Sequence, residues 1–339
     1  MSEFQRSFIV SVILIILNVT FLYSKNKPSS IPEHFKHVDQ LLWIVSDLEI
    51  VKSHWASLGF TQIHDLGKTE LISKSGAHTI IRMAKANLGG AHVNWIQPID
   101  QNSLFTKFQQ QHGDGVLSIV HRLPGEREVS GEIDRLAHLG VDVLEEIEIK
   151  TGNGILHYVL MDTRAEGKYI LGYTYGDACQ EIVKSLLPDN RNALKLNQYA
   201  FAIRNAEQVS EYWNILGQPV FQINHPELGN THYYGKQVDH KLIQGWQKHG
   251  TIDYEWCIPV KPPIVYEDYI KKHGEGIHHL AFTIDDMDKV LEDFTSLGYV
   301  VSMGGTWGEE GSPGSGRYEY IDTEDAGGVT IELLWSFKE

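Results

Sequence analysis

The chain has 339 residues, of which 42% are hydrophobic, and its formal net charge at pH 7 is -15. This length is enough for two domains, each with its own core, and an acidic chain without a Lys/Arg cluster lacks the basic surface that nucleic-acid binding needs. Cys179 and Cys257 are its only cysteines, which excludes a disulfide framework and a thiolate metal cluster.

The N-terminal segment differs in kind from the rest of the chain. Residues 7–23 form an apolar run without a charged side chain, between Arg6 and Lys25. Such a run is typical of an export signal or an uncleaved anchor, and the lack of an obvious small-x-small cleavage site favours the anchor. The alternatives are a buried N-terminal helix or a start codon assigned too far upstream. We therefore predict a signal peptide or membrane anchor plus linker over residues 1–30. The protein would then be exported or anchored through residues 7–23, and cytoplasmic if this segment is not a signal.

From about Lys36 onward, one unit is repeated four times. Each copy contains an amphipathic helix that ends in a Leu-Gly pair, because the glycine can take the left-handed conformation of a helix C-cap. These helices are predicted at 47–58, 126–139, 205–216 and 286–297. A strand precedes each helix, at 40–45, 116–123, 198–203 and 277–284. Further strand-like runs follow, and they end in 93–96, 169–173, 254–258 and 329–335. The unit is thus a strand, a helix and about three more strands.

The last copy carries the most informative side chains. In the strand 277–284, alternation predicts that His278 and Leu280 share the apolar face that packs on the helix, and that His279 points to the other side. In the strand 329–335, Glu332 also stands opposite the apolar face. A histidine and a carboxylate therefore face one space, and we expect the chemistry there.

Two segments of this copy resemble the second module of methylmalonyl-CoA epimerases: Gly276-Ile277-His278-His279-Leu280-Ala281-Phe282 and Gly327-Gly328-Val329-Thr330-Ile331-Glu332-Leu333. The four units together resemble the vicinal oxygen chelate superfamily, which includes glyoxalase I, bleomycin-resistance proteins and extradiol dioxygenases. The resemblance implies an α+β fold of four βαβββ modules, paired into two domains with curved, cup-shaped mixed sheets. We place these domains at residues 31–188 and 189–339. We expect the helices of each domain to cover its own convex face.

The resemblance also implies a metal site. In this superfamily, each unit places one ligand in its first strand and one in its last. In the C-terminal half these positions are Gln198, Glu255, His279 and Glu332, a combination that resembles the glyoxalase I type. Parity also puts Gln198 and Glu255 on the concave side, where the two carboxylates need a proton or a cation nearby. One divalent ion, Zn, Mn, Co, Ni or Fe, is therefore predicted.

The N-terminal half offers weaker donors at the same positions, namely Gln40, Asn94, Ser118 and Leu171. None of them carries a charge that would offset the dehydration of a divalent ion. We predict that this half binds no catalytic metal and has a structural or substrate-shaping role.

The predicted function is that of a metal-dependent lyase or isomerase of glyoxalase or epimerase type. A metal-polarised carbonyl acidifies the neighbouring C–H group, and Glu332 or Glu255 is the candidate base. The substrate would be a small carbonyl or acyl compound, with Arg317 as a candidate for binding a substrate anion. Two alternatives stay open. One is an Fe(II)-dependent extradiol-type dioxygenase, although such enzymes use two histidines and one carboxylate; the other is a non-enzymatic small-molecule binding protein.

Overall fold

The computed structural model describes residues 31–151, 154–176 and 194–337. The predicted signal or anchor over residues 1–30, the predicted domain boundary at 188/189 and Cys179 lie outside these ranges, whereas Cys257 is a buried free thiol. Within these ranges, no helix is both long enough and apolar enough to span a membrane.

The N-terminal half has the following elements in chain order: η1 (Glu33–Lys36), β1 (Gln40–Ile44), α2 (Leu48–Ser57), β2 (Ile63–Ser73), β3 (His78–Leu88), β4 (Ala91–Pro98), α3 (Leu104–His112), β5 (Gly115–Arg122), α4 (Glu126–Ala137), β6 (Val143–Thr151), β7 (Gly154–Met161), α5 (Arg164–Gly167) and β8 (Ile170–Tyr175).

The C-terminal half continues with β9 (Lys195–Ala202), α7 (Ala206–Ile215), β10 (Gln222–Asn224), β11 (Leu228–Tyr233), β12 (Lys236–Gln237), β13 (Lys241–His249), β14 (Ile252–Lys261), α8 (Val265–His273), β15 (Gly276–Thr283), α9 (Met287–Ser296), β16 (Val300–Trp307), β17 (Gly316–Asp322), η2 (Glu324–Ala326) and β18 (Thr330–Ser336).

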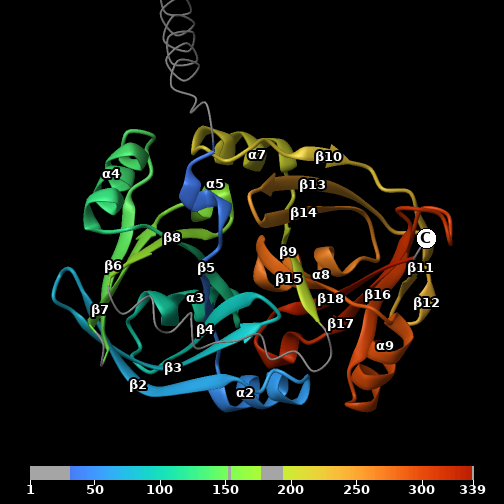
Figure 1. Ribbon diagram of the computed structural model, residues 1–339, viewed down its shortest axis with the longest axis horizontal. Helices are drawn as coiled ribbons and strands as arrows, with labels where there is room; N and C mark the ends of the chain where they lie inside the picture. Colours follow the sequence, from blue (N-terminus) through green and yellow to red (C-terminus); the bar gives the residue numbers. More distant parts are fainter. Residues whose placement is uncertain (1–30, 152–153, 177–193, 338–339) are drawn as a thin grey trace, which may run out of the picture.

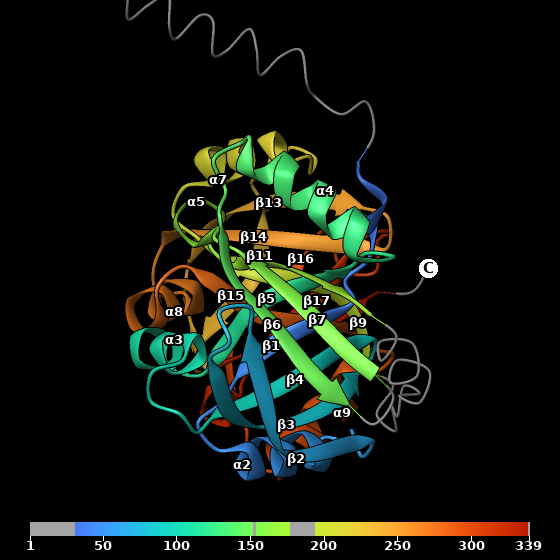
Figure 2. The ribbon, with the colours of Figure 1, turned by 90° about the vertical axis from the view of Figure 1, so that its left-hand side faces the viewer.

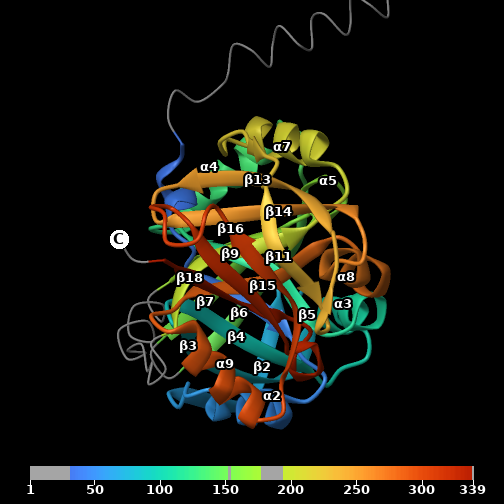
Figure 3. The same ribbon diagram turned by 90° about the vertical axis from the view of Figure 1, so that its right-hand side faces the viewer.

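The predicted four-unit α+β fold is confirmed. The four predicted helices appear as α2, α4, α7 and α9, within one or two residues of their predicted ends. Each is followed by a glycine of positive φ, at Gly59, Gly140, Gly217 and Gly298, so the repeated Leu-Gly signal marks true helix C-caps. The sequence analysis missed α3 and α8, which link the units within each half and lie side by side (Figures 2 and 3).

The first two units form a closed barrel with the strand order β1-β4-β3-β2-β6-β7-β8-β5. Two pairings between units close it, β1 with β5 and β2 with β6 (Figure 2). Its interior is filled by apolar side chains, among them Leu42, Ile81, Phe105 and Tyr158. A barrel that is closed and packed in this way leaves little room for a ligand.

The last two units form an open, curved sheet with the order β10-β13-β14-β9-β15-β18-β17-β16-β11-β12 (Figures 1 and 3). The counterpart of β2 is broken here into β10, which pairs with β13, and β11, which pairs with β16. Pro226 lies in the gap between them, and proline has no backbone N–H to donate to a ladder. The break keeps the sheet open and its concave face accessible.

The two halves share one hydrophobic core. Trp43 and Trp95 of the barrel belong to the same buried cluster as Phe201 and Phe282 of the open sheet. Trp43 Nε1 also donates to the Gly327 carbonyl at 2.6 Å. We expected the helices of each half to cover its own convex face. They cover only part of that face, because the other half covers much of the rest of it.

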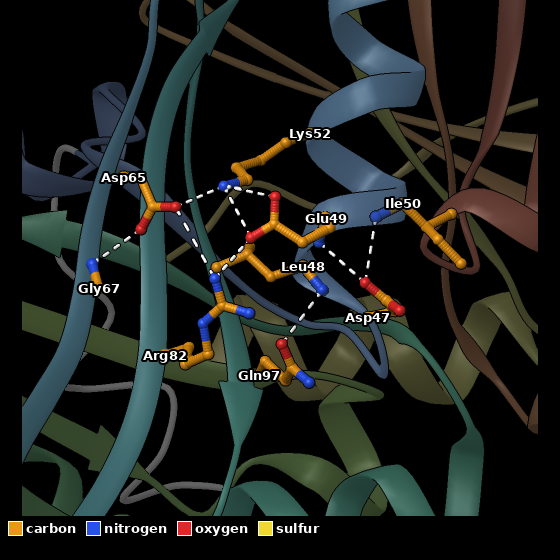
Figure 4. A network of polar contacts seen from close by, with 9 residues as sticks. All are labelled: Asp47, Leu48, Glu49, Ile50, Lys52, Asp65, Gly67, Arg82 and Gln97. Carbon is orange, nitrogen blue, oxygen red and sulfur yellow. Dashed lines mark hydrogen bonds and ion pairs between the residues drawn. The ribbon is translucent and has the colours of Figure 1, made fainter.

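Helix α2 is joined to strands β2 and β3 by polar contacts at its N-terminus (Figure 4). Asp47 caps the helix by accepting from the backbone N–H of residues 49 and 50. Lys52 forms ion pairs with Glu49 and with Asp65 of β2, and Arg82 of β3 donates to Glu49. These partly exposed pairs fix the direction of α2 more than they stabilise the fold.

We expect a pH-dependent loss of stability to which His54 contributes. His54 of α2 is buried, and its ring is hydrogen-bonded to the Tyr299 hydroxyl of the other half. Burial lowers its pKa to about 4, so between about pH 6.5 and 4 the unfolded chain binds a proton that the folded chain excludes. Through this residue alone, the free energy of unfolding should be about 2 kcal/mol lower at pH 5 than above pH 6.5.

Urea unfolding at pH 7 and pH 5 checks this expectation. The His54→Gln variant should lose less stability than the wild type between the two pH values, since both proteins share every other histidine. Equal losses in the two proteins would show that His54 is not the cause.

Candidate metal centre

The four predicted ligands meet on the concave face of the open sheet. Gln198, Glu255, His279 and Glu332 come from β9, β14, β15 and β18, which are consecutive neighbours in the sheet. Each is at most 4% exposed. One donor atom from each of Glu255, His279 and Glu332 lies within 4.8 Å of the other two.

The contacts within this group are short. His279 Nε2 lies 3.1 Å from Glu332 Oε2 and 3.5 Å from Glu255 Oε2. The Gln198 amide donates to Glu255 Oε2 at 2.7 Å and to Glu332 Oε2 at 3.3 Å. In the sheet, Glu255 is paired with Ala200 and Glu332 with Ala281. Both carboxylates therefore lie on the face that the alternation predicted.

His278 does not lie where the sequence analysis put it. A bulge in β15 leaves it unpaired between Ile277 and His279, so Ile277, not His278, shares the apolar face with Leu280. His278 Nδ1 instead lies 2.8 Å from His279 Nδ1. Burial lowers the pKa of His278 well below its usual value, so the neutral ring can accept the His279 Nδ1–H and fix the orientation of that imidazole.

Three further residues support the group, and the sequence analysis missed them. The Gln244 amide donates to Glu255 Oε1 at 2.6 Å. The Tyr320 hydroxyl lies 3.5 Å from His279 Nε2 and 2.6 Å from the Tyr266 hydroxyl. Tyr320 stands directly opposite Glu332 in the β17–β18 ladder. The alternation of tyrosines at 318 and 320 was the signal that could have identified it.

The electrostatics of the group favour a cation. Burial alone would lower the pKa of His279, but hydrogen bonds to Glu255 and Glu332 and their charges raise it to about 9. Burial raises the pKa of Glu332 against the opposing effect of His279. Two buried carboxylates sharing one imidazolium still leave an excess of negative charge, which a divalent ion would neutralise.

A cavity of about 370 Å³ opens above this group. Its floor includes Gln198, Glu255 and Glu332, and its rim includes residues on both sides of the strand break, such as Asn224 and Leu228. This volume is in the range of small-molecule sites. The break between β10 and β11 therefore gives a ligand access to the predicted metal ligands.

Arg317 is not part of this cavity, and its predicted role in binding a substrate anion needs correction. It alternates with Tyr318 and Tyr320, which line the cavity, so its side chain leaves the opposite face of β17. There it contacts Asp288 of α9 at 2.9 Å and the buried Glu319 at 2.7 Å. Arg317 ties α9 to the sheet.

The N-terminal counterpart of the group is an uncharged hydrogen-bonded cluster. Asn94 and Tyr158 both donate to Gln40 Oε1 inside the closed barrel. In the C-terminal half, Ala281 of β15 is paired with Glu332 of β18; at the equivalent place in the N-terminal half, Val120 of β5 is paired with Gly172 of β8. The counterpart of Glu332 is thus Gly172 and not Leu171, which lies in the core shared by the two halves.

Comparisons with known proteins agree with this architecture. The model of the Glyoxalase/Bleomycin resistance protein/Dioxygenase superfamily matches residues 197–315. No curated protein matches the chain. A mutant of 4-hydroxymandelate synthase from Streptomyces coelicolor is similar, with a TM-score of 0.55 and 13% identity, over 88% of this chain and 92% of that one. The Mn(II)-bound glyoxalase from Novosphingobium aromaticivorans has a TM-score of 0.50 and 13% identity, over 90% of this chain and 83% of that one. At this identity, the structural likeness shows the fold alone.

Proposed function

We propose that this chain, whose residues 197–315 match the model of the Glyoxalase/Bleomycin resistance protein/Dioxygenase superfamily, is a metal-dependent lyase or isomerase that moves a proton next to a substrate carbonyl. The observation that carries the proposal is the buried group of Gln198, Glu255, His279 and Glu332 at the floor of an open cavity. Oxygen donors with one imidazole suit Zn, Mn, Co, Ni or Fe(II). The residues present therefore fit a divalent ion, and these four would hold it.

A bound divalent ion would polarise a substrate carbonyl and acidify the neighbouring C–H group. The protein's own part is to supply the base. Glu332 uses Oε2 for its contacts with Gln198 and His279, and its carboxylate also interacts with the Tyr320 hydroxyl; Oε1 is the oxygen that would accept the proton. Glu255 is held at both oxygens, by Gln244 and by Gln198. This difference favours Glu332 as the base and Glu255 as a ligand.

Burial affects two groups at the proposed site. It raises the pKa of Glu332, an effect that a bound divalent ion would oppose. Burial also raises the pKa of Tyr320 well above its usual range, so its phenol keeps the proton and stays a hydrogen-bond donor. The apolar cavity walls would exclude water from the proton transfer.

Metal analysis combined with isotope exchange tests the proposal. The protein is purified without added metal, and its metal content is measured by mass spectrometry. It is then incubated in D₂O with 2-hydroxy-1-phenylethanone. We expect one divalent ion per chain and metal-dependent deuterium incorporation at the carbon that bears the hydroxyl group. Glu332→Gln should abolish the incorporation.

Other results would point to the alternatives. Oxygen consumption with Fe(II) and a catechol, without deuterium exchange, would favour an extradiol-type dioxygenase. The arrangement of one histidine and two carboxylates argues against that activity, since dioxygenases of this kind use two histidines and one carboxylate. A bound ion without either activity would favour a binding protein.

A further inference from the structure

The cavity above the candidate metal centre has no cationic wall. Among the described residues, its lining contains no lysine, arginine or histidine. The charged side chains that do line it are Glu255 and Glu332, which belong to the proposed metal site. The remaining wall consists of apolar, aromatic and uncharged polar side chains.

Lys195, which pairs with Thr283, and His225, beside Asn224, are exposed and do not belong to the lining. Three other basic side chains near the wall have partners of their own. Arg317 leaves the opposite face of β17, and Lys248 lies over the ring of Trp246 while it pairs with Asp253 at 3.0 Å. His240 contacts the Tyr318 hydroxyl at 3.1 Å. Burial lowers the pKa of His240 to about 4, so this histidine is uncharged at neutral pH.

The charge of the loaded site is balanced. A divalent ion contributes +2, and the carboxylates of Glu255 and Glu332 together contribute -2, so their sum is zero. A ligand carboxylate or phosphate would therefore meet no net positive charge. Burying such an anion without a partner is strongly unfavourable, whereas an uncharged ligand carries no such penalty.

The rest of the wall fits a flat, apolar ligand. The half-buried Trp246 and Trp307 and the buried Met303 and Tyr318 line the cavity. Aromatic rings and methionine offer large apolar surfaces for stacking against another ring. At the rim, the amides of residues such as Asn197 and Asn224 offer hydrogen bonds without charge.

We propose that the site takes an uncharged aromatic carbonyl compound, and that it discriminates against anionic ligands. The carbonyl follows from the metal-dependent function proposed above, on which this inference rests. The exclusion of anions follows from the cavity wall itself. Compounds that carry a phosphate or carboxylate on the part that enters the cavity would then be poor ligands.

A matched pair of compounds tests the charge preference. The neutral 1-phenyl-1,2-propanedione and its anionic 4-carboxylate share the phenyl ring and the diketone, and they differ in a charge that would face the cavity wall and not the metal ion. Titration calorimetry with the zinc-loaded protein should show at least tenfold tighter binding of the neutral diketone. Equal or tighter binding of the carboxylate, or no binding of the neutral diketone at millimolar concentration, would overturn the inference.

A variant pair shows whether the wall sets this preference. Ser336 lines the cavity and is exposed at the end of β18. Ser336→Arg adds a cation there and should reduce the preference for the diketone at least tenfold, whereas Ser336→Gln should leave it unchanged. An unchanged preference in Ser336→Arg would count against the inference. Zinc content, measured in each sample, separates this outcome from failure of the proposed function, which would appear as protein that binds no zinc.

Discussion

His279→Ala is expected to reduce the metal content of the purified protein from one divalent ion per chain to nearly none. His279 supplies the sole imidazole of the donor group, and its loss leaves two carboxylates and an amide, a set that holds late transition metals poorly. The strands that carry the other donors are ordered by their own packing, so the fold should persist. Mass spectrometry of the metal and circular dichroism of the same sample would measure both effects.

Gln40→Ala is the matched control for this experiment. Gln40 is the counterpart of Gln198 in the closed barrel. Its Oε1 accepts from Asn94 and Tyr158, and its amide donates to Asp39, which pairs with Arg122. The metal content should stay at one per chain. Two ions per chain in the wild type, with one lost in Gln40→Ala, would show that the N-terminal half is a metal site after all. Full metal content in His279→Ala would remove His279 from the ligand set.

Trp43→Ala should destabilise the whole protein by about 3 to 5 kcal/mol, the usual cost of emptying a fully buried tryptophan site. Trp43 is 0% exposed, and its ring packs edge-on against Trp55 and Trp95. Its Nε1 also donates to the carbonyl of Gly327, just before the strand that carries Glu332. The variant should therefore also bind metal more weakly, although Trp43 lies in the half without the site.

Trp43→Phe separates the two contributions of this residue. Phenylalanine keeps most of the packing but cannot donate to Gly327, so it should lose less stability than the alanine variant. Denaturant unfolding and metal titration of both variants would measure the difference. If Trp43→Ala unfolded in two steps with the C-terminal transition unchanged, the shared core would not couple the halves as we infer.

The resemblance selected the four donor positions, and local alternation agreed with it. The ladders are regular at Glu255 in β14 and at Glu332 in β18, so parity placed both carboxylates correctly on the concave face, although the pairing of β9 is irregular next to Gln198. Parity failed for His278, because a bulge shifts the register between Ile277 and His279. A bulge depends on the pairing with a partner strand, and a single strand's sequence does not reveal it.

Arg317 was assigned to the site because it lies in the strand before Glu332, but the parity of its neighbours Tyr318 and Tyr320 should have placed it outside. Two other misses arose from long-range packing. Neither the sharing of one core by Trp43 and Phe282 nor the closure of the barrel through the pairing of β2 with β6 has a local signal. Both depend on contacts between distant parts of the chain.

The break at Pro226 also has a consequence for solubility. An open sheet has two free edges, and unpaired edges can recruit strands from other molecules and start aggregation. Here the edges are β10, with three residues, and β12, with two. Such short, exposed and mostly polar edge strands give another chain little to pair with. The interruption that admits a ligand also creates these edges, since one unbroken strand in place of β10 and β11 would close this sheet as β2 closes the barrel. The shortness of the two edge strands limits the tendency to aggregate that comes with this opening.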